Sequence, residues 1–158
     1  MSKAITKDGT TTLNPTEFTA ALKEYRAYVR QQKRLSGEHV RTTTVHSRQL
    51  CGSQLTLDAH IEQGTVKALG FSIQACSLGQ ASTAIVLQRA AGLTKEEIQQ
   101  AAEQLDTLLI GQWPEQALIW PELAIFIHAA SMPARHDSAR LVFRALQQLF
   151  EEEEKQLK

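Results

Sequence analysis

Two consecutive runs of alternating apolar and polar residues constrain the fold of this chain more than any other feature of its sequence. In both runs apolar residues recur at about every second position, which is typical of a β-strand with one buried face. The apolar positions are Leu55, Leu57, Ala59 and Ile61 in the first run and Val66, Ala68, Phe71 and Ile73 in the second. A loop at residues 62–65 separates the runs and contains Gly64, so the sequence predicts an antiparallel hairpin.

The two cysteines of the chain lie at the open end of this hairpin, Cys51 before its first strand and Cys76 after its second. A register that pairs Ile61 with Val66 also pairs Cys51 with Cys76. Opposed residues in an antiparallel pair have Cα atoms about 4.5–5.5 Å apart, so the sulfurs are predicted to lie within reach of one ion or of each other. The apolar spacing slips before Phe71, and a bulge at Gly70 would move this register by one residue. The cysteines would then still be neighbours.

Cys76 also marks a change of pattern. After it, the apolar spacing becomes helical, which predicts a helix from Ser77 that ends at Gly92. Backbone N–H groups and the helix dipole at such an end favour a thiolate over a thiol. Gly52 and Gly79 follow the two cysteines closely and would let the backbone approach a bound ion or partner.

The remaining segments predict one more strand and further helices. Residues 39–47 are rich in β-branched side chains and predict a strand that joins the hairpin. The other helices are predicted to begin at Pro15, after Thr94, at Pro121 and after Pro133. The expected fold is α+β, a small three-stranded antiparallel sheet with helices packed on one face. Residues 1–12 are predicted to be disordered, residues 13–150 to form a single domain, and residues 151–158 to be a charged C-terminal end.

The composition of the chain excludes several classes of function. The chain has 158 residues and 42% hydrophobic content, enough for one domain with a full core. Its 17 basic and 17 acidic residues give zero net charge, which disfavours nucleic-acid binding. No apolar run reaches the roughly 18 residues that span a membrane, so a cytoplasmic protein is expected. There, a cysteine pair is more often metal-binding or catalytic than a structural disulfide. The motifs of hydrolases and phosphate loops do not occur, and no enzyme is predicted beyond a sulfur-transfer role.

Three features together resemble a known family. Cys51-Gly52 follows a short strand, the second cysteine lies in the segment FSIQACSLGQAS at residues 71–82, and Pro133-Ala134-Arg135 precedes an amphipathic helix. Over residues 15–150 the chain resembles the iron–sulfur cluster assembly scaffolds, the IscU, SufU and NifU N-terminal group. The long segment between Cys76 and Pro133 is most similar to the SufU-type branch. The resemblance implies a site of three cysteines and one aspartate that carries a cluster, a persulfide or a zinc ion.

The chain departs from this pattern at two ligand positions. Cys51 and Cys76 match the first two cysteines of the family, whereas Ser53 stands in place of the aspartate and Ser138 in place of the third cysteine. A neutral serine hydroxyl does not replace a thiolate as a ligand for zinc or iron. A four-ligand site would therefore need further donors.

Two neighbouring side chains could supply those donors. His136 or Asp137 would complete the site by turning inward. In the alternative interpretation, Asp137 or Ser138 caps the last helix.

Three hypotheses follow for the function. In the first, the protein is a scaffold or carrier that binds an iron–sulfur cluster, iron or zinc through Cys51 and Cys76, with Asp137 or His136. The resemblance implies a cysteine desulfurase and iron–sulfur acceptor proteins as partners, and two thiolates per chain would allow four in a homodimer. In the second, the protein relays sulfur as a persulfide on Cys76, which needs one reactive thiolate and no metal. In the third, it is an interaction protein that has kept the fold and lost the site.

Overall fold

The computed structural model describes residues 4–5, 11–31, 33–48 and 52–156. Its central element is a three-stranded antiparallel sheet in the order β3-β4-β5. The strands are β3 (Val40–His46), β4 (Gln54–Glu62) and β5 (Thr65–Gln74). This arrangement confirms the predicted hairpin, the additional strand and the α+β class.

The hairpin turn is shorter than predicted. Ile61 pairs with Val66 as expected, but Glu62 also pairs with Thr65, so only Gln63 and Gly64 form the turn. Their φ angles are 53° and 78°. Positive φ at both central residues is the geometry of a type I′ turn, whose twist matches that of the flanking strands. The four-residue loop expected from the sequence was wrong by two residues.

The register shift is present, but it lies between His60 and Ile61 of β4, opposite Lys67, and not at Gly70. Beyond it, the ladder continues to the pair Gln54 and Gln74. The shift exchanges the inward-facing positions of β5, so Leu69 rather than Ala68 lies opposite Ala59 on the buried face. Because Cys51 lies outside the described residues, its expected pairing with Cys76 stays a prediction.

Gly70 has a different role from the predicted bulge. A Cβ atom at this position would lie 2.4 Å from the backbone nitrogen of Leu35 and 2.7 Å from its Cβ. The glycine is therefore required because the connection between α1 and β3 presses against β5 at this point.

The helices agree with the predicted starts. They are α1 (Pro15–Val29), α2 (Ser77–Gln88), α3 (Lys95–Leu109) and α4 (His136–Gln156). Capping boxes begin α1, through Asn14 and Glu17, and α3, through Thr94 and Glu97. The helix expected at Pro121 is a 3₁₀ helix, η1 (Pro121–Ala129), and a short one, η2 (Pro133–Arg135), leads into α4.

The chain ends behave differently from one another. In the segment predicted to be disordered, β1 (Ala4–Ile5) pairs with β2 (Thr11–Thr12). At the other end, α4 continues through most of the charged segment. The domain boundaries proposed from the sequence stay a prediction.

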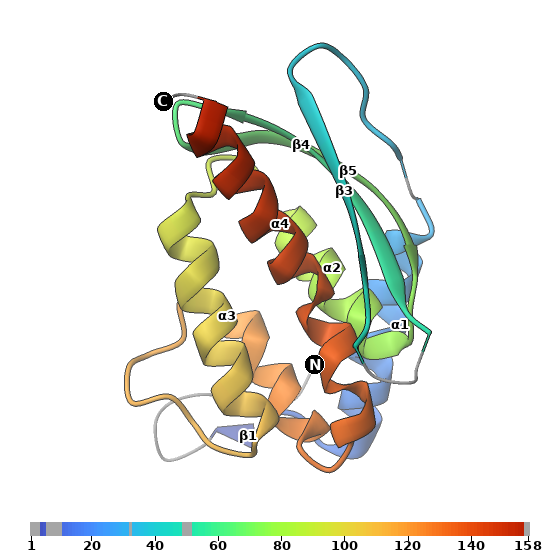
Figure 1. Ribbon diagram of the computed structural model, residues 1–158. Helices are drawn as coiled ribbons and strands as arrows, with labels where there is room; N and C mark the ends of the chain where they lie inside the picture. The colour runs from blue at the N-terminus through green and yellow to red at the C-terminus, as the bar shows by residue number, and fades with distance from the viewer. Residues whose placement is uncertain (1–3, 6–10, 32, 49–51, 157–158) are drawn as a thin grey trace.

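The sheet and helices form layers (Figure 1). Helix α4 crosses the sheet in contact with β3 and β4, and α3 lies on the side of α4 away from the sheet. The inward-facing residues of β4 are at most 5% exposed and belong to one hydrophobic core with the apolar sides of α2, α3 and α4. Burial of this apolar surface is the main force that holds the layers together.

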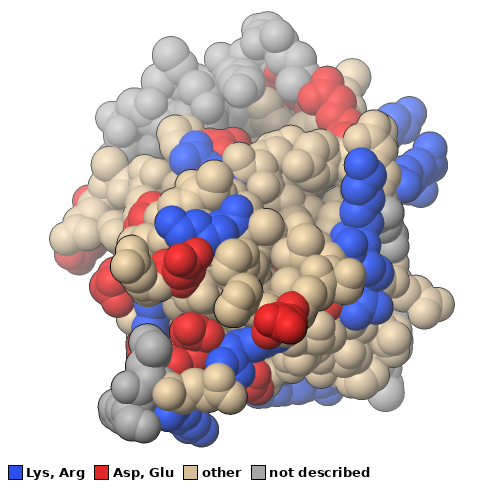
Figure 2. Space-filling view, turned by 90° about the horizontal axis from the view of Figure 1, so that it is seen from above, with Lys and Arg blue, Asp and Glu red and all other residues tan. Residues whose placement is uncertain are grey.

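Charged side chains are mixed over the surface that is seen when the molecule of Figure 1 is viewed from its top. Figure 2 shows acidic and basic groups interspersed on this face, in keeping with the zero net charge of the sequence. None of the described helices combines the length and the apolar content that a bilayer crossing requires.

A buried carboxylate anchors the α1–β3 connection to the outer face of the sheet. Asp58 of β4 is 0% exposed. Its oxygens accept hydrogen bonds from Arg34 Nε (2.7 Å), Arg34 Nη2 (2.9 Å), Leu35 N (2.9 Å) and Thr42 Oγ1 (2.6 Å). Beside this anchor, Phe71 N donates to Lys33 O at 2.7 Å. Burial raises the pKa of Asp58, but the hydrogen bonds from Arg34, Thr42 and Leu35 lower it by more than burial raises it. The pKa therefore lies below its ordinary value.

We expect Asp58→Asn to lower the free energy of unfolding at neutral pH by about 2–3 kcal/mol, because it leaves Arg34 without its carboxylate. The expected loss of stability is smaller than for a fully buried ion pair, because the Arg34 side chain is 54% exposed. A lowered pKa stabilises the fold above the ordinary pKa of aspartate, about 3.9, and that stability is lost as the pH falls through the folded-state value. The difference between wild type and variant should therefore shrink on acidification below about pH 4.

Denaturant unfolding measured as a function of pH checks this prediction. Glu153→Gln, which removes the pair between Arg41 and a carboxylate that is 20% exposed rather than fully buried, is the matched control and should change stability by less than about 1 kcal/mol. Equal effects of the two variants at neutral pH would contradict the anchoring role of Asp58.

Candidate functional site

Cys76 is the N-cap residue of α2, as the sequence predicted. Its backbone is extended, with φ −69° and ψ 174°, and its side chain forms no capping hydrogen bond. The carbonyl oxygen of Cys76 accepts the N–H of Gln80 at 3.0 Å, which closes the first turn of the helix. The thiol is free, partly exposed and packed against the edge of the hydrophobic core. Cys76 is therefore neither sealed in the core nor fully exposed to solvent.

Two buried serines meet beside the start of this helix. Ser53 lies directly before β4 and Ser138 lies in the first turn of α4, and the two are 3% and 0% exposed. Ser138 Oγ donates to Ser53 Oγ at 3.1 Å. These are the two positions at which the sequence departs from the scaffold pattern. The fold thus brings both positions together, as a hydrogen-bonded hydroxyl pair.

Gly79 lies between the hydroxyl pair and the cysteine. A Cβ atom at Gly79 would lie 2.4 Å from Ser138 Oγ and 2.8 Å from the Cβ of Ala75. The first turn of α2 therefore rests on the first turn of α4, three residues after Cys76. We expected Gly79 to admit an ion or a partner, but the structure fills this space with α4 itself.

Asp137 is engaged by groups outside the predicted site. It is 5% exposed, and its Oδ2 accepts the backbone N–H of Arg48 and lies 3.5 Å from Arg144 Nη2. Arg144 Nη2 also donates to the carbonyl oxygen of His46 at 2.7 Å. These contacts hold the segment after β3 against α4. Burial lowers the pKa of Arg144, and the nearby charge of Asp137 partly opposes this effect.

His136 is likewise bound to another group. Its side chain is buried, and Nε2 lies 2.7 Å from the carbonyl oxygen of Ala129, so this nitrogen donates and carries the proton. Helix α4 begins at His136, so Asp137 and Ser138 lie inside its first turn and neither is the cap residue. The capping interpretation was therefore wrong.

The metal site predicted from the sequence is not assembled in the described part of the chain. Within residues 4–5, 11–31, 33–48 and 52–156, no three His, Cys, Asp or Glu side chains are placed to hold one metal ion. Cys51 lies outside these ranges, so the ligand set stays a prediction. What the described residues offer is one partly exposed cysteine at a helix N-terminus, near a buried, hydrogen-bonded pair of hydroxyls.

Sequence reasoning missed the partners of Asp137. Arg144 is seven residues later in the same helix, and residues at this spacing share one helix face, so the pairing had a local signal. Arg48 is 89 residues away in sequence, and its contact with Asp137 has no such signal.

Comparisons with solved structures agree with the fold. No family model and no curated protein matches the sequence. Among solved structures, the N-terminal part of a nitrogen-fixing NifU-like protein from Brucella abortus is similar at a TM-score of 0.72 and 26% identity, over 81% of this chain and 88% of that chain. A putative iron–sulfur cluster assembly scaffold protein for the SUF system from Fervidobacterium islandicum is similar at 0.69 and 16%, over 85% and 97%. A hypothetical protein is similar at 0.68 and 16%, over 87% and 99%.

We expect Ser53→Ala and Ser138→Ala each to lower the free energy of unfolding by about 1 kcal/mol, because each leaves a buried hydroxyl without this partner. The double variant should lose less than the sum of the two losses, since it removes donor and acceptor together. Denaturant unfolding of the four proteins measures the coupling. Strictly additive losses would contradict a direct bond between the two hydroxyls.

Proposed function

The chain is an IscU/SufU/NifU-like protein by fold, and from this premise we propose that it serves iron–sulfur cluster assembly by carrying sulfur as a persulfide on Cys76. The observation that carries this proposal is the contact between Ser53 and Ser138. At the two positions where the family has ligands, this chain has a neutral hydroxyl pair, whereas Cys76 remains accessible. A single thiolate is sufficient for sulfur transfer and insufficient for a stable four-ligand site.

The chemical step is a transfer between two sulfur atoms. The Cys76 thiolate attacks the terminal sulfur of a persulfide on the donor's cysteine. A new S–S bond forms at Cys76 while the S–S bond of the donor breaks, and the donor's cysteine leaves as a thiolate. The proton of the terminal sulfur stays with the transferred group, so no external oxidant or reductant is needed.

The surroundings of Cys76 suit this step. Its partial exposure allows attack on a partner's persulfide, and its side chain is not consumed by capping α2. The first turn of α2, whose N–H groups attract negative charge, begins directly after Cys76. Contact with the apolar core limits the access of water from the other side.

The partners follow from the same role. A cysteine desulfurase would supply the persulfide, and proteins that build or accept iron–sulfur clusters would receive the sulfur. The Fervidobacterium protein of the same fold is described as a scaffold of the SUF system. A location in the cytoplasm, where thiols stay reduced, is part of the proposal.

A cluster carrier is the second candidate, because a solved structure of the same fold is described as a putative iron–sulfur cluster assembly scaffold protein. In this case Cys51 and Cys76 bind iron or a transient cluster, either with Asp137 or His136 or with the same two cysteines of a second copy. Asp137 and His136 would first have to leave Arg48 and Ala129. Each release would expose a buried polar group without its partner, which costs about 1–3 kcal/mol.

We expect incubation with a cysteine desulfurase and L-cysteine under anaerobic conditions to add sulfur to Cys76. Intact-protein and peptide mass spectrometry would detect the added mass. Cys76→Ser should abolish the labelling, and Cys51→Ser, the matched control, should retain it. Labelling of Cys51 alone, or of neither cysteine, would refute the proposal.

Metal and inorganic sulfide content of the freshly isolated protein separates the remaining candidates. Iron with sulfide that is lost in both cysteine variants would identify a cluster carrier. Size measurement with and without bound iron would then test the homodimer. The absence of both persulfide and metal would leave an interaction protein that has kept the fold alone.

A further inference from the structure

The free edge of β3 lies outside the site described above, at the opposite edge of the sheet from Cys76. Strand β3 forms one edge of the sheet, and β5, which leads into Cys76, forms the other. In Figure 1, β3 runs along its edge beside α4, and β4 and α4 are the described elements that pack extensively against it. The outward backbone groups of β3 are therefore candidates for pairing with another strand.

The register with β4 assigns the backbone groups of the even-numbered residues of β3 to the free edge. Ser47 N donates to Ser53 O at 2.9 Å across the sheet, so the neighbouring His46 directs its N–H and C=O groups away from β4. The pairing has no shift along β3, so the same holds for Thr44 and Thr42. The main-chain groups of these two threonines have no hydrogen-bond partner within the described chain, and both residues are exposed.

Contacts at both ends limit the free stretch to its centre. At the start of β3, Val40 N donates to Gly37 O at 3.2 Å. At its end, His46 O accepts a hydrogen bond from Arg144 Nη2 at 2.7 Å. Both bonds use groups that point away from β4, which supports the alternation, and they occupy the edge on either side of residues 42–44. A strand that pairs here is thus confined to this short stretch.

A second copy of β3 fits this stretch. In an antiparallel pair of identical strands with a two-fold axis at Thr43, Thr42 of each copy lies opposite Thr44 of the other. Each such pair exchanges both backbone hydrogen bonds, so every free N–H and C=O group of residues 42 and 44 finds a partner. An axis at Thr42 would instead set Thr44 O against the occupied Val40 N. An axis at Thr44 would set Thr42 N against the occupied His46 O.

Helix α4 accompanies β3 along the same edge and runs antiparallel to it. Arg144 contacts His46, and Gln148 Oε1 accepts a hydrogen bond from Thr43 Oγ1 at 2.8 Å. Arg144, Gln148 and Glu152 are spaced by four residues, so they lie on one side of the helix. An axis at Thr43 therefore places Arg144 of one copy at the same end of the interface as Glu152 of the other.

One end of this side of α4 is positive and the other is negative. The charges that act on Arg144 are those of Arg48, Arg140 and Asp137. The exposed charges at the other end are those of Glu151, Glu152 and Lys155. Because the two-fold axis brings unlike ends together, association of two copies also gains electrostatic attraction. A parallel arrangement of the strands would bring like ends together.

We propose that two copies of this chain associate through the free edges of β3, antiparallel about a two-fold axis at Thr43, so that their sheets become one continuous sheet. This dimer needs no metal ion and no cysteine, so it differs from a dimer held together by a shared cluster. Cys76 follows β5 and stays outside the interface. The inference goes beyond the proposed sulfur relay and does not depend on it.

Disulfide trapping tests the register. Thr43→Cys, in a chain that also carries Cys51→Ser and Cys76→Ser, places one thiol of each copy at the axis, where opposed Cα atoms lie about 4.5–5.5 Å apart and can be bridged by a disulfide. We expect mild oxidation to give a covalent dimer on a non-reducing gel. His46→Cys in the same background, the matched control, should stay monomeric. Equal cross-linking of the two variants, or none with Thr43→Cys, would overturn the proposal.

Sedimentation of the unmodified chain measures the association. Because the contact is short, we expect a dissociation constant on the order of 100 µM, with mostly dimer at about 1 mM protein and mostly monomer at about 10 µM. Thr44→Pro removes an N–H that β4 does not use, so it should keep the fold and weaken the dimer at least about tenfold. A chain that stays monomeric at about 1 mM, or a folded Thr44→Pro variant that associates as the wild type does, would contradict the proposal.

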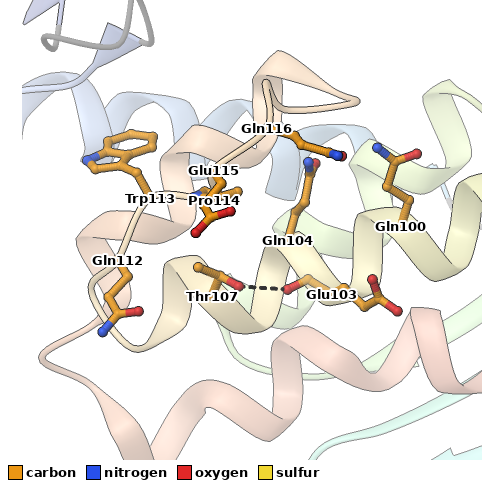
Figure 3. A pocket seen from close by; sticks show the side chains of 9 residues that line it. All are labelled: Gln100, Glu103, Gln104, Thr107, Gln112, Trp113, Pro114, Glu115 and Gln116. Carbon is orange, nitrogen blue, oxygen red and sulfur yellow. Dashed lines mark hydrogen bonds between the residues drawn. The ribbon is translucent and has the colours of Figure 1, made fainter.

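Charge variants test the placement of α4. Glu152→Lys sets a positive charge at the same end as Arg144 of the other copy and should weaken the dimer at least about threefold at low salt. The matched control is Glu103→Lys, which changes the net charge equally but lies in the hollow between α3 and residues 112–116 that Figure 3 shows. Both glutamates are exposed, so both variants should fold. Equal effects of the two variants would refute the two-fold arrangement.

Discussion

The packing of β4 against α4 positions every residue of the candidate site. Because side chains alternate between the two faces of a strand, burying Leu55, Leu57 and the rest of this row fixes the register of the whole sheet. Ser53 lies two residues before Leu55, and Ser138 lies at the start of the helix that covers the row, so their contact follows from the same packing. The entry to α2 is placed by β5, whose register is set against β4. A slip of one residue would displace all three elements together.

The register shift opposite Lys67 lets apolar residues from both halves of β5 face the core. Val66 is an even-numbered inward residue, whereas Phe71 is odd-numbered, and both are buried. An unbroken strand would direct one of them to the solvent side. The sequence pattern indicated that a register shift was needed, but the predicted position at Gly70 was wrong. Gly70 is instead required by its contact with Leu35, which is distant in sequence. Nothing in the pattern around Lys67 distinguishes it as the extra residue.

Local signals were sufficient for the elements, and long-range contacts explain what sequence reasoning missed. The capping boxes at Asn14 and Thr94 each depend on two residues three positions apart, and both were recognisable. By contrast, the alternation of the strand assigns Asp58 to the solvent side, and its burial depends on Arg34 and Leu35 in another segment. The contact between Ser53 and Ser138 spans 85 residues, and only the resemblance to a family suggested that they belong to one site. Periodicity alone could not have paired them.

The close approach of Gly79 and Ser138 has an electrostatic consequence. Each is the third residue of its helix, so α2 and α4 begin at the same point and the positive ends of two macrodipoles converge there. Asp137 offsets part of this potential, but its carboxylate is already occupied by Arg48 and Arg144. A negatively charged group that lies at this point, such as a persulfide sulfur, would interact favourably with these oriented peptide groups. Because the groups belong to the main chain, single side-chain substitutions would leave most of this effect intact.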